Sequence, residues 1–177
     1  MTTSSAVLTC VVETPKGSRN KYEYDEGLAR IRFDRFLAAP LVYPADYGFI
    51  PGTLSEDGDP LDALICVSEA TFPGCAIDVK PVALFEMEDE HGRDDTIVCV
   101  PCGDPAWIGV DELEDLPDQL RDEIGQFFST YKDLDPARSS LVLGWRGRSD
   151  AIATTDAARE RFHQRASTTD KKGANEP

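Results

Sequence analysis

A turn runs directly into an apolar strand at Asp57-Gly58-Asp59-Pro60-Leu61-Asp62-Ala63-Leu64-Ile65. Gly, Asp and Pro are typical turn residues, so a solvated turn accounts for Asp57 and Asp59. It does not account for Asp62, which lies inside the apolar run. Carboxylates about 4 Å apart repel by about 4 kcal/mol at an effective dielectric of 20, and three that converge raise one another's pKa or require a cation. The segment therefore predicts a site for a hard cation such as Mg²⁺, Mn²⁺ or Ca²⁺.

Short strands are expected on both sides of this segment. Runs of apolar and β-branched residues separated by Gly, Pro and Asp are typical of such strands. The predicted strands are Ala6–Glu13, Lys21–Tyr24, Arg30–Phe36, Leu61–Val67, Ile77–Glu86 and Thr96–Pro101, and the second and third form a hairpin.

Helical spacing appears after the last of these strands. Apolar residues between Leu120 and Tyr131 recur on one helical face, which predicts a helix that begins near Pro117. A second helix is expected from Thr154 or Thr155 to about Arg165, and the polar residues 166–177 are expected to form a loose tail. Short strands followed by helices indicate one α+β domain over residues 1–165 with a small barrel-like sheet.

The charge of the chain excludes several classes of partner. The 177 residues hold 18 Lys and Arg against 33 Asp and Glu, for a net charge of −15. Nucleic acids and anionic membrane surfaces attract basic proteins, so neither is an expected partner. No long apolar segment and no basic, apolar leader are visible, and we expect a cytoplasmic location.

Cysteine usage is also consistent with a reducing compartment, since the chain has five cysteines, an odd number. Cys99 and Cys102 have the CxxC spacing of redox motifs and of half a zinc site. No second pair is present, and neither His91 nor His163 has the spacing of a zinc finger. We therefore expect Cys99 and Cys102 to be packing residues.

Strand alternation in Arg30–Phe36 suggests an inward-facing cation. If Ile31 and Phe33 face inward, Arg35 faces inward as well and needs an anionic partner. The alternative is an arginine at a strand end that extends to solvent. In the neighbouring strand Lys21 and Glu23 share a face, which would also suit a plain surface pair.

A second acidic cluster follows at residues 88–95, Glu-Asp-Glu-His-Gly-Arg-Asp-Asp. Such a run between strands is often only a solvated loop. Together with the first cluster and with inward Lys and Arg, it indicates a phosphoryl-transfer site, in which carboxylates hold Mg²⁺ and cations hold phosphate oxygens. Tyr131 and Lys132 could add a phenol and an ammonium group. The chain has no Gly-rich phosphate loop, so side chains would hold the phosphate.

Further motifs accompany these clusters in a fixed order. They are Glu13-Thr14-Pro15, Asn20-Lys21-Tyr22-Glu23, Asp34-Arg35-Phe36, Tyr43-Pro44-Ala45-Asp46-Tyr47-Gly48-Phe49-Ile50, Asp89-Glu90-His91-Gly92-Arg93-Asp94-Asp95 and Phe127-Phe128-Ser129-Thr130-Tyr131-Lys132-Asp133-Leu134. From about residue 10 to 165, their order and spacing resemble the soluble family I inorganic pyrophosphatases of the bacterial type. The resemblance implies an OB-like five-stranded β-barrel with flanking α-helices. It also implies hydrolysis of inorganic diphosphate to two orthophosphates with several Mg²⁺ ions, for which Mn²⁺ is a possible substitute, and a homo-oligomer, commonly a hexamer in bacterial members.

The resemblance further implies a role for each site residue. Ligands of the activating metals are matched by Asp57, Asp62 and Asp94, with Asp62 shared between two ions, and those of a further ion by Asp89 with Asp94. Outer-sphere or additional metal contacts are matched by Glu13 and Glu23, and phosphate ligands by Lys21, Arg35, Tyr131 and Lys132. Asp59 is similar to the residue that accepts the proton of the attacking water, and Tyr47 to the phenol that hydrogen-bonds that carboxylate. The residues alone leave open whether Asp59 or Asp94 is the general base.

One position departs from the family pattern. Where the family usually has a phosphate-binding lysine, two residues after Asp94, this chain has Thr96. Arg93 is nearby in sequence and is a candidate replacement for that charge. The departure keeps open a second function, an acidic divalent-cation-binding protein that has lost catalysis. A third, an OB-type nucleic-acid binder, is disfavoured by the negative charge.

Overall fold

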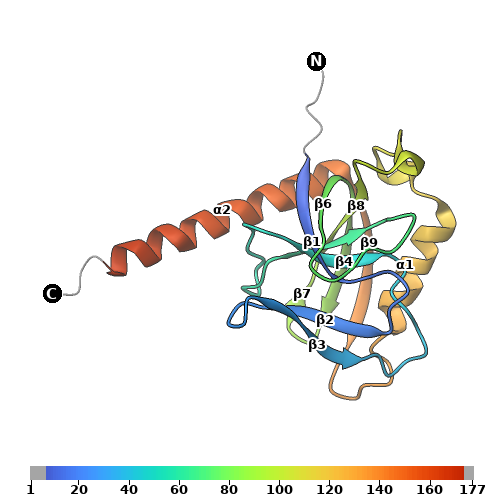
Figure 1. Ribbon diagram of the computed structural model, residues 1–177, viewed down its shortest axis with the longest axis horizontal. Helices are drawn as coiled ribbons and strands as arrows, with labels where there is room; N and C mark the ends of the chain where they lie inside the picture. Colours follow the sequence, from blue (N-terminus) through green and yellow to red (C-terminus); the bar gives the residue numbers. More distant parts are fainter. Residues whose placement is uncertain (1–6, 174–177) are drawn as a thin grey trace.

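Five strands close into a ring that forms the body of the protein. The structure is a computed structural model and describes residues 7–173. Its strands are β1 (Leu8–Thr14), β2 (Asn20–Asp25), β3 (Arg30–Phe36), β4 (Asp46–Ile50), β5 (Leu61–Ile65), β6 (Ala76–Asp89), β7 (Gly92–Arg93), β8 (Thr96–Pro101) and β9 (Ser140–Gly147). Strands β1, β4, β5, β8 and β6 are hydrogen-bonded in that order, and β6 pairs back with β1 (Figure 1). Neighbours in the ring are antiparallel except for the parallel pair β5–β8. The predicted α+β fold with a five-stranded barrel is confirmed.

Strands β4, β7 and β9 were not predicted from the sequence. The first is only five residues long and contains Gly48, a residue that usually weakens a strand. The structure shows why glycine is needed there, because a Cβ atom on Gly48 would lie 1.9 Å from the carbonyl oxygen of Val11 on β1. Close pairing of β1 with β4 therefore depends on Gly48, the same residue whose low strand propensity prevented the prediction of β4.

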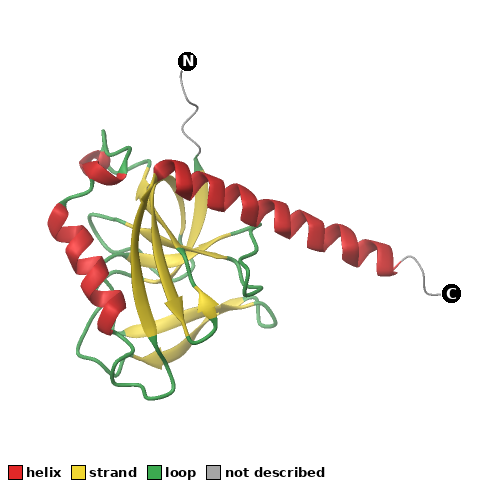
Figure 2. Cartoon of the chain, turned by 180° about the vertical axis from the view of Figure 1, so that it is seen from behind, coloured by secondary structure: helices red, strands yellow, loops and turns green. Residues whose placement is uncertain are grey.

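Two helices cover the barrel, and each has its own apolar cluster (Figure 2). They are α1 (Asp118–Thr130) and α2 (Arg148–Gly173), and two short 3₁₀ turns, η1 (Pro105–Trp107) and η2 (Leu113–Asp115), precede α1. Every residue of β8 is buried, with Val98 and Val100 in the α1 cluster and Ile97 and Cys99 in the α2 cluster. Apolar side chains on both faces of β8 thus place the strand between two packed layers.

Helix α1 follows Pro117 as predicted, but α2 is longer than expected. It begins at Arg148 instead of Thr154 or Thr155, and it continues to Gly173 where a loose tail was predicted. The tail prediction rested on the lack of apolar residues. A helix satisfies its backbone hydrogen bonds internally, so polar residues extend it until a breaker such as Gly173. The rest of the predicted tail, residues 174–177, lies outside the described residues.

The β2–β3 hairpin forms a separate two-stranded sheet beside the barrel (Figure 1). The expectation that Phe33 faces inward is wrong, because its side chain is 54% exposed. Lys21 pairs with Arg35 and Tyr22 pairs with Phe33, so Asp34 is an extra residue in β3. Such a bulge reverses the alternation of side chains. Arg35 therefore faces the pocket described below, although Phe33 faces solvent.

Candidate active site

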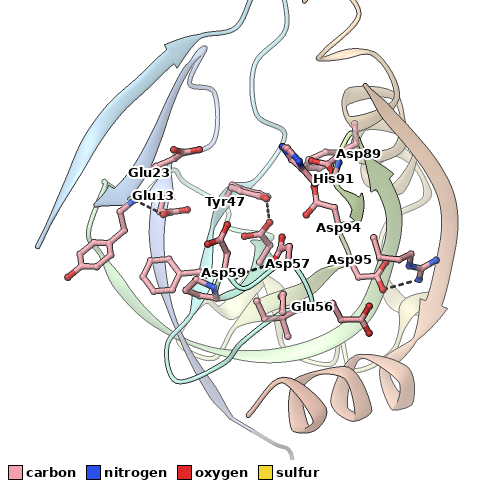
Figure 3. Close-up of a pocket in the computed structure, with 18 of the residues that line it drawn as sticks. Glu13, Glu23, Tyr47, Glu56, Asp57, Asp59, Asp89, His91, Asp94 and Asp95 are labelled. Carbon is pink, nitrogen blue, oxygen red and sulfur yellow. Dashed lines mark hydrogen bonds and ion pairs between the residues drawn. The ribbon is translucent and has the colours of Figure 1, made fainter. Parts of the chain in front are cut away.

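A cavity of about 830 Å³ lies between the barrel, the hairpin and α2. Every site residue proposed from the sequence lines it: Glu13, Lys21, Glu23, Arg35, Tyr47, Asp57, Asp59, Asp62, Asp89, Asp94, Tyr131 and Lys132. Figure 3 shows Tyr47 and Asp57 near the middle of this group, with Glu13 and Glu23 on one side and Asp89 and Asp94 on the other. The fold thus gathers both the acidic and the cationic side chains around one space.

Tyr47 and Asp62 form the floor of the pocket. On paired strands β4 and β5, Tyr47 lies opposite Leu64 and Phe49 lies opposite Asp62, so the tyrosine and the aspartate share one face as diagonal neighbours. The Tyr47 hydroxyl donates a hydrogen bond to Asp62 Oδ2. The resemblance implied that this phenol contacts the carboxylate of Asp59, and the structure corrects that expectation. The difference follows from the β4–β5 register, since the sequence did not predict β4.

Asp62 and Asp94 are two acidic groups in contact. Burial, and next the charge of Asp94, raise the pKa of Asp62 well above its usual value. Burial and the charge of Asp89 likewise raise the pKa of Asp94, which also contacts Asp62. Among residues 7–173 no three His, Cys, Asp or Glu side chains already converge on one point. The donors are nevertheless hard oxygens with like charges that repel, which is the donor set that a divalent cation fits.

Asp57 and Asp59 lie on the loop between β4 and β5. The loop is closed by hydrogen bonds within it, since Ser55 N–H donates to the Asp59 carbonyl at 2.7 Å and Asp59 N–H donates to the Asp57 side chain, at Oδ1, at 3.0 Å. Gly58 has φ of +99°, a conformation that favours glycine at this turn. Burial and the charge of Asp57 raise the pKa of Asp59. A carboxylate with a raised pKa accepts a proton more readily, which suits a general base.

Glu13 and Glu23 face this loop from β1 and β2 (Figure 3). Burial raises the pKa of Glu13 to about 7, although the Tyr24 N–H donates to its Oε1 at 2.7 Å. Glu23 forms an ion pair with Lys21. One glutamate thus has a marked tendency to take up a proton, while the other neutralises a cation of the pocket.

The three cations predicted to bind phosphate, Lys21, Arg35 and Lys132, all form ion pairs with carboxylates. Arg35 pairs with Asp34, and Lys21 Nζ lies 3.8 Å from Asp34 Oδ2. Lys132 is 6% exposed and lies 3.2 Å from both Asp89 and Glu90. These ion pairs hold the side chains in place before any substrate arrives, and they leave charged nitrogen atoms at the wall of the cavity.

The structure also shows where Thr96 lies, the position at which the chain departs from the family pattern. Thr96 is 1% exposed, is absent from the lining of the cavity, and has a buried hydroxyl without a hydrogen-bond partner. It lies beside Asp62 in the parallel β5–β8 register. Arg93, the candidate replacement, lines the cavity but pairs with Glu86 at 2.8 Å and Asp95 at 2.9 Å. Its charge is therefore already neutralised by two carboxylates.

Several lining residues were missed by sequence analysis. They are Tyr43, Glu56, Arg138 and Arg161. No signal in the sequence singles them out, because their contact with the cavity depends on tertiary packing that no local spacing reveals.

The cysteines and the helices bear on two remaining features, disulfide bonds and membrane-spanning segments. All five cysteines are free, and Cys99 is buried in β8 as expected. The expectation that Cys102 is also a packing residue is wrong, because it is exposed just after β8 ends at Pro101. Within residues 7–173, none of the helices combines the length and the apolar character needed to span a bilayer.

Known proteins share both the sequence and the architecture. The inorganic pyrophosphatase family pattern matches residues 10–163. The inorganic pyrophosphatase of Methanosarcina acetivorans is 51% identical over 160 residues, which cover 90% of this chain and 95% of the relative. That of Streptomyces coelicolor is 47% identical over 151 residues, covering 85% and 93%. The crystal structure of inorganic pyrophosphatase from Thermus thermophilus matches with a TM-score of 0.88 at 40% identity, covering 92% of this chain and 95% of that one.

These matches span almost the whole described chain, and they confirm the resemblance that the motifs indicated. The matched region runs from the strand that carries Glu13 to the helix that carries Arg161. The chain therefore belongs to the inorganic pyrophosphatase family.

Proposed function

We propose that this chain hydrolyses inorganic diphosphate to two orthophosphates in the cavity described above, with Mg²⁺ as its metal. The observation that supports this most strongly is the joint lining of one cavity by hard carboxylate donors and by ion-paired cations, in a chain of this family. Diphosphate is a small, highly charged anion, and such a substrate needs both kinds of group. A protein that only stored cations would have no use for the cationic wall.

The acidic side chains would hold the metal. Asp57, Asp62 and Asp94 are the proposed principal ligands, with Asp62 shared between two ions and Asp94 joined by Asp89 for a further ion. Glu13 and Glu23 are the proposed outer-sphere contacts. Bound Mg²⁺ supplies charge neutralisation for diphosphate and lowers the pKa of the attacking water. Mn²⁺ has a similar preference for oxygen ligands and is the proposed substitute.

Three cations and the Tyr131 phenol would bind and orient the phosphate groups. Lys21 and Arg35 enter from the hairpin, and Tyr131 and Lys132 enter from the end of α1. Their positive charge and hydrogen-bond donors stabilise the charge that develops on the leaving phosphate. Because the ion pairs with Asp34, Asp89 and Glu90 already hold three of these side chains, little reorganisation is needed when substrate binds.

A carboxylate would take the proton from the attacking water. Asp59 suits this role because its pKa is raised by burial and by the neighbouring Asp57, and because it stands on a loop at the edge of the cavity. Asp94 is the second candidate, since burial and Asp89 raise its pKa as well. Tyr47 would orient Asp62 through its hydrogen bond.

The setting of the enzyme is part of the same proposal. Residues 1–165 would act as one catalytic domain in the cytoplasm, without nucleic-acid or membrane partners. Exposed Leu141 (58%) and Leu143 (43%) on β9 are apolar surface that a homo-oligomer, such as a hexamer, would cover.

Phosphate release from diphosphate tests the proposal. The purified chain is assayed across a Mg²⁺ series, with Mn²⁺ in parallel and with EDTA as a control. We expect release that depends on the metal and stops with EDTA. Calorimetric Mn²⁺ binding without any phosphate release would instead support the cation-binding protein that has lost catalysis.

A further inference from the structure

Helix α2 is anchored to the barrel next to the loop that carries Asp57 and Asp59. Its small residues Ala151 and Ala158 are fully buried in the apolar cluster, with Thr155 buried between them. These positions lie on one helical face, so this part of α2 packs closely on the strands. The C-terminal part of α2 extends past the barrel (Figure 1).

Two hydrogen bonds join α2 to Leu54, which lies in this loop. Leu54 N–H donates to the Ala158 carbonyl at 3.0 Å, and Arg161 Nε donates to the Leu54 carbonyl at 2.8 Å. Both backbone groups of Leu54 therefore bind the same helix, 104 and 107 positions further along the chain. A third contact follows one turn later, where Arg165 Nη1 lies 3.4 Å from the Gly58 carbonyl.

The loop has few other ties to the barrel. At its base, the buried Thr53 hydroxyl donates to the Ile50 carbonyl and accepts from Leu61 N–H at 2.9 Å. Its remaining hydrogen bonds, between Ser55 and Asp59, are internal and fix its shape but not its position. The direction in which the loop presents its carboxylates therefore depends on α2.

Arg161 also differs from the other cations that line the cavity. Lys21, Arg35, Arg93, Lys132 and Arg138 each form an ion pair, whereas Arg161 has none among the described residues. Its charge is thus available to the acidic loop and to the cavity, while its Nε is used by Leu54.

We propose that Arg161 is a positioning residue that holds the loop of Asp57 and Asp59 against α2 and so sets the affinity of the site for divalent metal. The inference rests on the proposed function, in which Asp57 is a metal ligand. Arg161 acts through the loop, by keeping the backbone of Leu54 on the helix. Without Arg161, the loop is displaced from α2 for part of the time. Because only the positioned loop binds the metal well, the apparent affinity for the metal falls.

The test compares Arg161→Met with Arg159→Met. Methionine keeps most of the length of arginine but removes every donor. Arg159 is a matched control on the same helix, since it lies two positions away, has a side chain that is 42% exposed, and among the described residues forms an ion pair only with Asp156. Mn²⁺ binding is measured by calorimetry without substrate, and amide hydrogen exchange is measured over residues 54–59.

For Arg161→Met we expect a Kd for Mn²⁺ about three- to tenfold higher, the range that one net hydrogen bond supplies. Exchange at Leu54 should be faster, and Arg161→Lys should recover part of both effects. Arg159→Met should match the wild type. An unchanged Kd, or unchanged exchange at Leu54, would overturn the positioning role. Asp57→Asn serves as the reference: an unchanged Mn²⁺ Kd in that variant would instead refute the metal role proposed for the loop.

Discussion

Replacing Asp62 by asparagine should have opposite effects on stability and on activity. Asp62 contacts Asp94 on the floor of the cavity, and each carboxyl has a raised pKa because of burial and neighbouring negative charge. A carboxyl whose pKa is raised on folding destabilises the folded state as the pH rises above its unfolded value. Asparagine removes one of the two charges and still accepts the hydrogen bond from Tyr47.

Coulomb's law bounds the size of the effect for two like charges in contact. Two charges about 4 Å apart repel by at most about 4 kcal/mol at an effective dielectric of 20. A proton shared by the pair relieves part of this, so we expect a gain of about 1–3 kcal/mol in metal-free protein. For a chain of this size each kcal/mol raises Tm by about 2–4 °C, which gives about 2–12 °C. The rate of phosphate release should meanwhile fall by at least about 10²-fold, the scale for one preorganised charge.

Thermal unfolding in EDTA and phosphate release in Mg²⁺ measure the two effects. Asp46→Asn is the matched control, because Asp46 is fully buried but accepts hydrogen bonds from Lys16 N–H at 2.7 Å and from the backbone and side chain of Thr71. It should lower Tm and leave the Mg²⁺ requirement unchanged. If Asp62→Asn lowered Tm as Asp46→Asn does and bound Mn²⁺ as the wild type does, Asp62 would be a structural residue and the reasoning would fail.

Three further predictions concern other parts of the chain. Thr96 lies outside the cavity lining, but Thr96→Lys should place a long cationic side chain beside Asp62, which does line it. The variant should raise kcat/KM by about 10–150-fold, the value of a charge-assisted hydrogen bond, and lower the Mg²⁺ needed for half-maximal rate; equal steady-state constants would show that the cavity has no need of that charge. Cys102→Ser should leave the activity equal in reducing and oxidising buffers, because Cys99 is buried in the core; reversible inactivation by oxidant that requires Cys102 would contradict this. Glu86→Gln should reduce the free energy of unfolding by about 1 kcal/mol at pH 7. Arg93 and Arg146 hold the pKa of Glu86 below its usual value, so this stabilisation is lost as the pH falls through the folded-state pKa. Urea titrations at pH 7 and pH 3 should show the difference between the two proteins shrink.

Much of the site could be predicted because its residues stand out locally. Asp62 is a carboxylate within an apolar strand, and no turn explains it. The acidic run at residues 88–95 and the Tyr131-Lys132 pair at a helix end are similarly conspicuous. Such residues violate the pattern of the element that carries them, and functional sites are where such violations are expected.

Contacts that depend on register or on distant packing could not be predicted. Tyr47 binds Asp62 because β4 pairs with β5 in one particular register, and Gly48 conceals β4 in the sequence. The side of the hairpin on which Arg35 lies depends on one extra residue, Asp34, that alternation cannot foresee. Arg161 reaches Leu54 across 107 positions. In each case the information lies in the pairing of two segments and not in either segment alone.

The most direct test of the central claim is a crystal structure with Mn²⁺ and a slowly hydrolysed diphosphate analogue. Anomalous scattering locates the metal without assumptions about its ligands. The account predicts anomalous peaks at about 2–2.5 Å from carboxylate oxygens of Asp57, Asp62 and Asp94, with the analogue between these ions and the Lys21, Arg35 and Lys132 side chains. Peaks elsewhere on the chain, or an analogue bound outside this cavity, would contradict it.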